Sequence, residues 1–113
     1  MNQPSDLRNQ VLRLTDMVAY GPGAVVSRTL LDHPAGTLTV FAFDEGQGLS
    51  EHTAPYDATV QVVEGAGEFT VGGTVHTVRA GEMLIMPAGV PHSVRARERF
   101  KMLLIMIRSR PVT

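Results

Sequence analysis

Short β-prone segments separated by glycine turns constrain the fold of this chain more than any other feature. The 113 residues include 11 glycines, several of them in pairs at Gly46 and Gly48, Gly65 and Gly67, and Gly72-Gly73. Glycine adopts the positive φ values that tight turns need, and a Gly-Gly pair between two β-prone runs is a strong hairpin signal. Many short strands at regular turn spacing, with almost no helical period, predict an all-β sandwich or barrel.

Nine segments have the residue pattern of strands. They are Ala24–Leu31, Thr37–Phe43, Leu49–Thr53, Thr59–Val63, Phe69–Val71, Thr74–Val78, Met83–Met86, His92–Ala96 and Phe100–Ile107. The stretch Val11–Tyr20 fits either the start of an edge strand or a short helical turn capped near Thr15-Asp16. Residues 1–8 are polar and are expected to form a loose arm.

Composition excludes several classes of function. The net charge of −1 gives no long-range field for nucleic acid or an anionic membrane. The chain has no cysteine, which excludes disulfides, thiolate catalysis and Cys-based zinc sites and suits a cytoplasmic location. We therefore expect no nucleic-acid or membrane partner. The alternating Arg95, Arg97, Arg99 and Lys101 are expected to form one solvated strand face rather than a binding patch.

The segment Met102–Ile107 is apolar at every position. A strand of this kind is typically covered on both faces. One face can fill the barrel, while the other needs a second sheet or a partner subunit. Together with Val25–Leu31, this segment predicts a homodimer.

Two stretches place a histidine beside an expected strand. Gly46–Gly65 reads GQGLSEHTAPYDATVQVVEG and contains His52, and Gly81–Ala96 reads GEMLIMPAGVPHSVRA and contains His92. These stretches resemble the two motifs of the cupin superfamily. The second motif is matched without a gap by Gly81, Pro87, Gly89 and His92, and the first by Gly46, His52 and Gly65.

This resemblance implies a double-stranded β-helix, the RmlC-like jelly-roll barrel. The conserved barrel would cover about residues 24–107, with an N-terminal arm at 1–23, in a single domain over 1–113. Cupins of this size commonly pair as dimers, in agreement with the apolar segments.

The metal-ligand positions of the cupin motifs are only half filled here. In metal-binding cupins the first motif supplies three ligands and the second supplies one. The second histidine position holds Ala54, the acidic position holds Ala58, and the asparagine that often follows the second motif is Ala96. The resemblance therefore leaves His52 and His92 as the metal ligands. Both should point into the barrel, with ring nitrogens within about 5 Å, and the two alanines should line the same cavity.

Two imidazoles leave the other coordination positions to water or substrate, so a divalent transition metal (Ni, Zn, Mn, Fe or Cu) is expected to bind weakly or not at all. Asp57 is a possible third ligand, but it lies one residue from the ligand position and faces away on a regular strand. A bulge after Pro55 would re-aim it. Tyr56 and Gln61 are poorer candidates. The alternative is a pair of neutral histidines that line a pocket and bind water or backbone.

The remaining motifs leave the function open among three classes. The first is a binding protein with a small-molecule pocket and a degenerate two-histidine metal site. The alternative is a metal-dependent enzyme, a dioxygenase or isomerase, that uses His52 and His92 as ligands. The third is an interaction module. Four methionines (Met83, Met86, Met102 and Met106) are candidates for the barrel lining, because methionine fills irregular cavities. No catalytic residue and no substrate is identified by these motifs.

Overall fold

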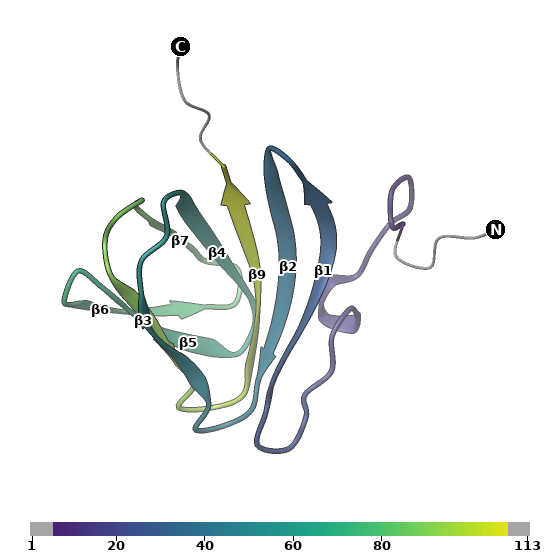
Figure 1. Ribbon diagram of the computed structural model, residues 1–113. Helices are drawn as coiled ribbons and strands as arrows, with labels where there is room; N and C mark the ends of the chain where they lie inside the picture. Colours follow the sequence, from purple (N-terminus) through teal and green to yellow (C-terminus); the bar gives the residue numbers. More distant parts are fainter. Residues whose placement is uncertain (1–5, 109–113) are drawn as a thin grey trace, which may run out of the picture.

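Nine antiparallel strands and one short 3₁₀ turn make up the part of the chain, residues 6–108, that the computed structural model describes (Figure 1). The elements are η1 (Leu14–Asp16), β1 (Val25–His33), β2 (Gly36–Phe43), β3 (Gly48–His52), β4 (Asp57–Glu64), β5 (Ala66–Val71), β6 (Thr74–Arg79), β7 (Met83–Met86), β8 (His92–Arg95) and β9 (Phe100–Ile107). No helix in these residues is long and apolar enough to cross a membrane.

The strands form two sheets that face each other. The five-stranded sheet has the order β1-β2-β9-β4-β7, and the four-stranded sheet has the order β3-β8-β5-β6. Strands distant in sequence are therefore neighbours, as when β9 lies between β2 and β4. This arrangement is the double-stranded β-helix that the sequence predicted, and all nine predicted strands are present.

The main core lies between the sheets. Strand alternation sends the side chains of Phe43, Val60 and Met102 inward from the five-stranded sheet, and those of Phe69 and Val94 inward from the four-stranded sheet. The rings of Phe43 and Phe100 stack with centroids 4.6 Å apart. This cluster fills the closed end of the barrel and fixes the strands that carry the histidines.

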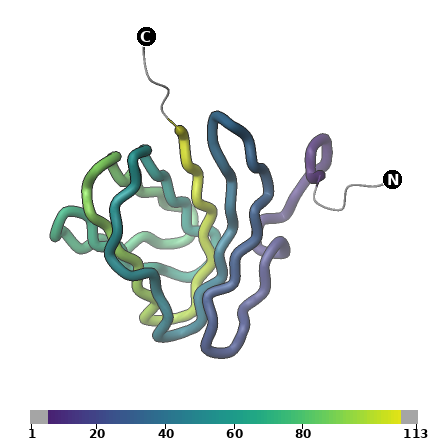
Figure 2. The backbone as a smooth tube through the Cα atoms, viewed as in Figure 1, coloured from purple at the N-terminus to yellow at the C-terminus, as the bar shows by residue number. Residues whose placement is uncertain are grey.

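A second apolar cluster lies on the outer face of the five-stranded sheet. It contains Val40 and Leu103 of the sheet and is covered by Leu7, Leu14 and Val18 of the N-terminal segment. Figure 2 shows this segment, in purple, beside the β1–β2 end of the sheet. The N-terminal segment thus partly covers the outer face of β9. The sequence had predicted that a second sheet or a partner subunit would cover this face.

The N-terminal region corrects one expectation and decides between two alternatives. Residues 6–8 are not loose, since Leu7 packs against the outer cluster, while residues 1–5 lie outside the described part of the chain. Val11 is fully exposed, and the ambiguous stretch after it contains the turn η1 rather than an edge strand.

Polar contacts hold the N-terminal segment to the sheet, and we call this group the N-terminal latch: Thr15, Tyr20, Glu64 and Lys101. The Tyr20 hydroxyl donates to Glu64 Oε2 at 2.5 Å, and Lys101 Nζ donates to the carbonyl oxygen of Thr15 at 2.7 Å. Burial, reinforced by Glu64, raises the pKa of Tyr20 far above its usual value. Lys101 is therefore buried and engaged, which corrects the expectation of a single solvated basic strand face.

Candidate functional site

The site is centred on His52 at the end of β3 and His92 at the start of β8. The two residues are directly paired across the strands, and their ring centroids lie 4.4 Å apart with the planes at 66°. His92 is buried, whereas His52 is exposed at the rim of the barrel. The structure therefore brings together the two histidines that the sequence singled out.

A β-bulge gives His52 its direction. Leu49 pairs with Val94 and His52 pairs with His92, so β3 advances three residues where β8 advances two. On a regular strand, residues three apart face opposite sides, and Leu49 packs on the core. The extra residue returns His52 to the side of His92. Sequence alternation alone would have placed it on the other face.

Backbone carbonyls select the tautomer of both rings in their neutral form. Nδ1 of His52 lies 2.9 Å from the carbonyl oxygen of Ser50, and Nδ1 of His92 lies 3.1 Å from that of Val90. Because a carbonyl oxygen only accepts hydrogen bonds, each Nδ1 carries the proton and donates. In the neutral rings each Nε2 then keeps a lone pair, which is the arrangement that suits a metal ligand or a hydrogen-bond acceptor.

The loops on either side of the site are tied to each other. The backbone N–H of Gly89 donates to the carbonyl oxygen of Ala54 at 2.8 Å, and that of Ala88 donates to Asp57 Oδ1 at 2.9 Å. Gly89 has φ of 77°, a conformation that favours glycine and lets the chain turn back toward His92. The motif residues thus shape the rim of the barrel.

Asp57 is occupied by this structural role. It begins β4 in regular register, paired with Ile107, while Ala58 pairs with Met106. No bulge re-aims its carboxylate, which instead caps the turn at Ala88. Among residues 6–108 no group of three His, Asp or Glu side chains gathers in metal-binding geometry. The structure therefore does not bring Asp57 together with the two histidines.

The three alanines singled out from the two motifs differ in their surroundings. Ala58 is 1% exposed and belongs to the core between the sheets, whereas Ala54 is half-buried at the rim. Ala96 is fully buried, and its backbone bonds to Gly46 and Gln47. Ala58 faces inward, where a larger side chain would meet the interior of the barrel.

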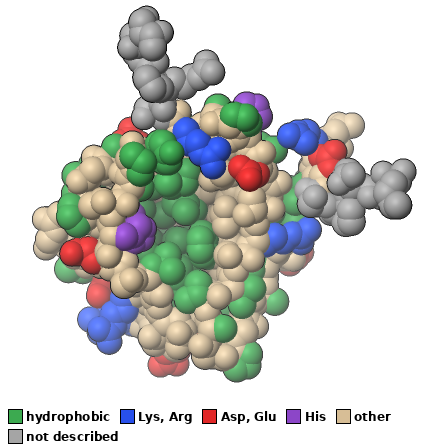
Figure 3. Space-filling model, in the orientation of Figure 1, with side chains coloured by type: hydrophobic (Ala, Val, Ile, Leu, Met, Phe, Trp, Pro, Cys, Tyr) green, Lys and Arg blue, Asp and Glu red, His purple; other side chains and the backbone are tan. Residues whose placement is uncertain are grey.

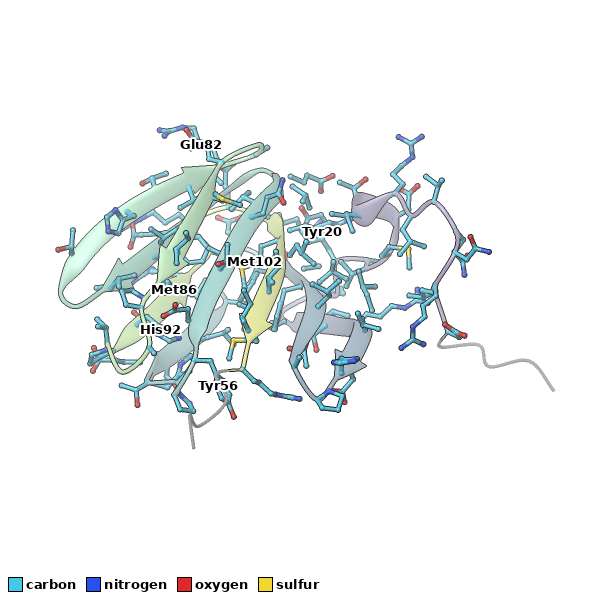
Figure 4. All side chains as sticks on the ribbon, turned by 90° about the horizontal axis from the view of Figure 1, so that it is seen from above. Tyr20, Tyr56, Glu82, Met86, His92 and Met102 are labelled. Carbon is cyan, nitrogen blue, oxygen red and sulfur yellow. The ribbon has the colours of Figure 1, made fainter. Side chains whose placement is uncertain are left out.

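Methionine side chains line the interior near Ala58. Met86 and Met106 both pair with Ala58 from the neighbouring strands, and Met102 lies further along β9. Figure 4 shows His92, Met86 and Met102 between the two sheets. Met83 is 56% exposed on the outer face, so three of the four methionines proposed from the sequence line the barrel and Met83 does not.

A hollow lies between the sheets at the open end. Figure 3 shows it lined by hydrophobic side chains, with a histidine at its rim. A separate apolar cavity of about 260 Å³ lies under the N-terminal segment and is lined mainly by leucines. That cavity is on the outer face of the five-stranded sheet, away from the histidines. The barrel interior is therefore the candidate site, because the His52–His92 pair lies there.

The comparisons with known proteins agree with this architecture. Residues 39–108 match the family model described as a cupin domain, so the chain belongs to the cupin family. A conserved protein of unknown function from Streptococcus pyogenes is 36% identical, with a TM-score of 0.86 over 92% of this chain and 91% of that one.

Two further structures are similar in fold. A cupin 2 conserved barrel domain protein from Leptotrichia buccalis is 39% identical, with a TM-score of 0.83; the match covers 86% of this chain but only 47% of that one. The salicylate 1,2-dioxygenase of Pseudoaminobacter salicylatoxidans, solved as adducts with gentisate, is 20% identical, with a TM-score of 0.69. The match covers 83% of this chain and 28% of that one. No curated protein matches the chain.

Proposed function

We propose that this cupin is a small-molecule binding protein whose pocket has the His52–His92 pair at its polar end. The observation that carries the proposal is the pair of Nε2 lone pairs left by the two Nδ1–carbonyl hydrogen bonds. Two lone pairs side by side require a partner that either donates hydrogen bonds to them or binds them as a metal ion does. A hydrogen-bond donor on a ligand, or a divalent transition metal, supplies such a partner.

The residues fit a weak metal site and not a strong one. Both histidines would hold the ion through Nε2, and water or substrate would complete its shell, since Asp57 is engaged elsewhere. A bound ion would act as a Lewis acid toward a ligand oxygen. The apolar walls would select the body of the ligand and exclude water from it.

A metal-dependent enzyme is the alternative use of the same pair. Its support is the fold shared with the salicylate dioxygenase, which at 20% identity speaks for architecture alone. We therefore place binding first.

Titration of untagged, metal-free protein with Ni²⁺ and Zn²⁺ by isothermal calorimetry tests the proposal. We expect weak binding that falls by at least about tenfold in both His52→Ala and His92→Ala, since each removes one of two ligands. His33→Ala is the matched control, because His33 lies at the end of β1, where its ring accepts a hydrogen bond from the Ala35 backbone. Equal affinity in all four proteins would overturn the metal part of the proposal.

Binding of an organic ligand is tested separately by a thermal-shift screen of small phenols, alcohols and amines, all of which carry hydrogen-bond donors. Hits should stabilise wild type and His33→Ala but not His92→Ala. Turnover of a hit under oxygen, with metal added, would support the enzyme alternative. Hits that stabilise His92→Ala equally would remove the histidine pair from the ligand site.

We also propose that the domain spans residues 1–113, with a barrel at about 24–107 and an arm at 1–23, and that it forms a homodimer. Support comes from the outer face of the five-stranded sheet, where Met83, Ile85 and Ile107 are each more than half exposed beyond the area that the N-terminal segment covers. Strand β7, which carries Met83 and Ile85, also forms one edge of this sheet. An exposed apolar face beside an open edge favours association of two copies.

A further inference from the structure

Two thioethers flank the position from which the carboxylate ligand is missing. Met86 on β7 and Met106 on β9 pair with Ala58 from opposite sides, so the three side chains form one row on the inner face of the sheet. Met86 is 2% exposed and Met106 is partly buried against the core. Ala58 puts only a methyl group between the two sulfur-bearing side chains.

This row lies at the same end of the barrel as the histidines. His52 ends β3 just before the loop that leads to Ala58, and Met86 ends β7 just before the turn that leads to His92. The two hydrogen bonds between these loops, from Gly89 to Ala54 and from Ala88 to Asp57, hold them together. A methionine side chain has three rotatable bonds, so its sulfur can be re-aimed without moving the backbone.

We propose that the barrel binds reduced copper, Cu⁺, through Nε2 of His52 and His92 and the sulfur atoms of Met86 and Met106. The inference rests on the proposed function, since it uses the same histidine pair. Thioether sulfur is a soft donor that suits Cu⁺, and imidazole also suits copper. Four donors complete a shell that the two histidines alone leave half empty.

The charge of the donor set favours a monovalent ion. All four donors are neutral, and the carboxylate of Asp57 is committed to the Ala88 backbone. The Born energy of burying an ion scales with the square of its charge, so a divalent ion loses about four times as much solvation as Cu⁺ in this setting. Nickel and zinc therefore bind weakly through the histidines, whereas Cu⁺ gains from the sulfur donors without needing a counter-charge.

Anaerobic competition of the metal-free protein with a chromogenic Cu⁺ chelator tests the inference. The variant Met86→Leu with Met106→Leu removes both sulfurs at nearly constant volume, a kind of change that cores tolerate. We expect its Cu⁺ affinity to fall at least tenfold, while weak Zn²⁺ binding stays unchanged. Met102→Leu is the matched control, because Met102 is a buried methionine of β9 that pairs with Val62 and not with Ala58.

X-ray absorption of the Cu⁺ protein gives a second readout that does not depend on the stability of a variant. Sulfur scattering in the wild type supports the proposal, and a shell of nitrogen and oxygen alone overturns it. Failure of wild type to compete for Cu⁺ overturns it as well. If the double leucine variant binds Cu⁺ like wild type while His52→Ala does not, the inference about the sulfur donors fails and the histidine site stands. If His52→Ala and His92→Ala both bind every ligand like wild type, the proposed function fails too.

Discussion

The alanines at positions 54 and 58 decide how strongly a hard divalent metal can bind beside His52 and His92. If they are vacated ligand positions, Ala54→His with Ala58→Glu should restore a four-ligand set. Each new side chain replaces a water ligand of the metal ion with a donor that the fold already holds in place. We expect Ni²⁺ or Zn²⁺ affinity, measured by isothermal titration, to rise at least about tenfold, which corresponds to ~1.4 kcal/mol.

The steric term opposes this gain, because Ala58 is buried and overpacking costs about 1–3 kcal/mol. Ala54→His with Ala58→Gln is the matched control, since it adds the same volume without the charge. A folded His/Glu variant that binds no better than wild type would show that the alanines are not lost ligands. The pocket would then be an organic-ligand site with two inherited histidines.

Asp44 makes stability depend on pH. The Gly23 backbone N–H at 2.6 Å, together with Arg99 at 2.8 Å, lowers the pKa of this carboxyl below its ordinary value. A lowered folded-state pKa gives stability that is complete above about pH 5 and is lost as the pH falls through that pKa. Asp44→Asn should therefore unfold at a lower temperature than wild type at pH 7, with the difference closing as the pH falls through the lowered pKa of Asp44.

Circular dichroism melts across this pH range provide the measurement. Glu51→Gln, at an exposed carboxylate of β3, is the control and should track wild type. A difference between wild type and Asp44→Asn that stays constant down to the acid limit would contradict the assignment.

Individual residues of the site were only partly predictable. His52 and His92 could be found because fixed motif spacing encodes them. The role of Asp57 could be half deduced, since alternation correctly turned it away from the ligand position, but its bond to Ala88 depends on a loop contact between residues 31 positions apart. The pairing of Met86 and Met106 with Ala58 depends on strand order, which no local pattern carries.

Among the structural elements, the N-terminal segment contributes most that was not foreseen. Its latch joins Tyr20 and Thr15 to Glu64 and Lys101 on the central strands. Tyr20→Phe removes one hydrogen bond to a carboxylate and leaves the ring in place. We expect the free energy of unfolding to fall by about 1–2 kcal/mol, measured by urea denaturation.

Tyr56→Phe is the control. It removes the same hydroxyl group at the barrel rim and should lower the free energy of unfolding by less than Tyr20→Phe does. If both variants lose equal stability, the latch contributes no more than an ordinary surface tyrosine. If Tyr20→Phe also lowers the denaturant dependence, the N-terminal segment unfolds apart from the barrel.

The strands were predictable because β-branched runs and glycine turns are local signals. The N-terminal segment was not, since its apolar residues follow neither a helical nor a strand period. They pack on the outer cluster through long-range contacts, and Leu7, Leu12 and Leu14 adopt no regular strand. Thus the existence and approximate positions of the strands could be predicted from sequence, whereas their exact ends, such as the start of β5 at Ala66, and the cover of β9 depend on tertiary structure.

At the scale of the whole molecule, the outer face of the five-stranded sheet sets the expected assembly. Ile85 pairs with Thr59, and Thr59 pairs with Ile105, so these three side chains form a row across the outer face of the sheet. The exposed Ile107 lies two residues beyond Ile105 on β9. We expect light scattering to show a dimer at micromolar concentration. Ile85→Glu with Ile107→Glu should give a folded monomer, because a charge in an apolar interface loses its hydration.

Val75→Glu is the control, since Val75 is also more than half exposed but lies on β6 in the other sheet. It should leave the dimer intact. A wild-type monomer at this concentration would contradict the dimer, and loss of the dimer in Val75→Glu would move the interface to the four-stranded sheet.

The bulge in β3 makes the site depend on counting as well as on chemistry. His52 lies three positions after Leu49 on one strand, whereas His92 lies two positions before Val94 on the other. Deleting Glu51 would leave the imidazole two positions after Leu49, so a regular strand without the bulge would still aim it at His92. Weak Zn²⁺ binding, measured by isothermal titration, should therefore survive this deletion. A relative with one residue fewer between the first motif glycine and its histidine can therefore keep the same histidine pair, provided that its strand also lacks the bulge.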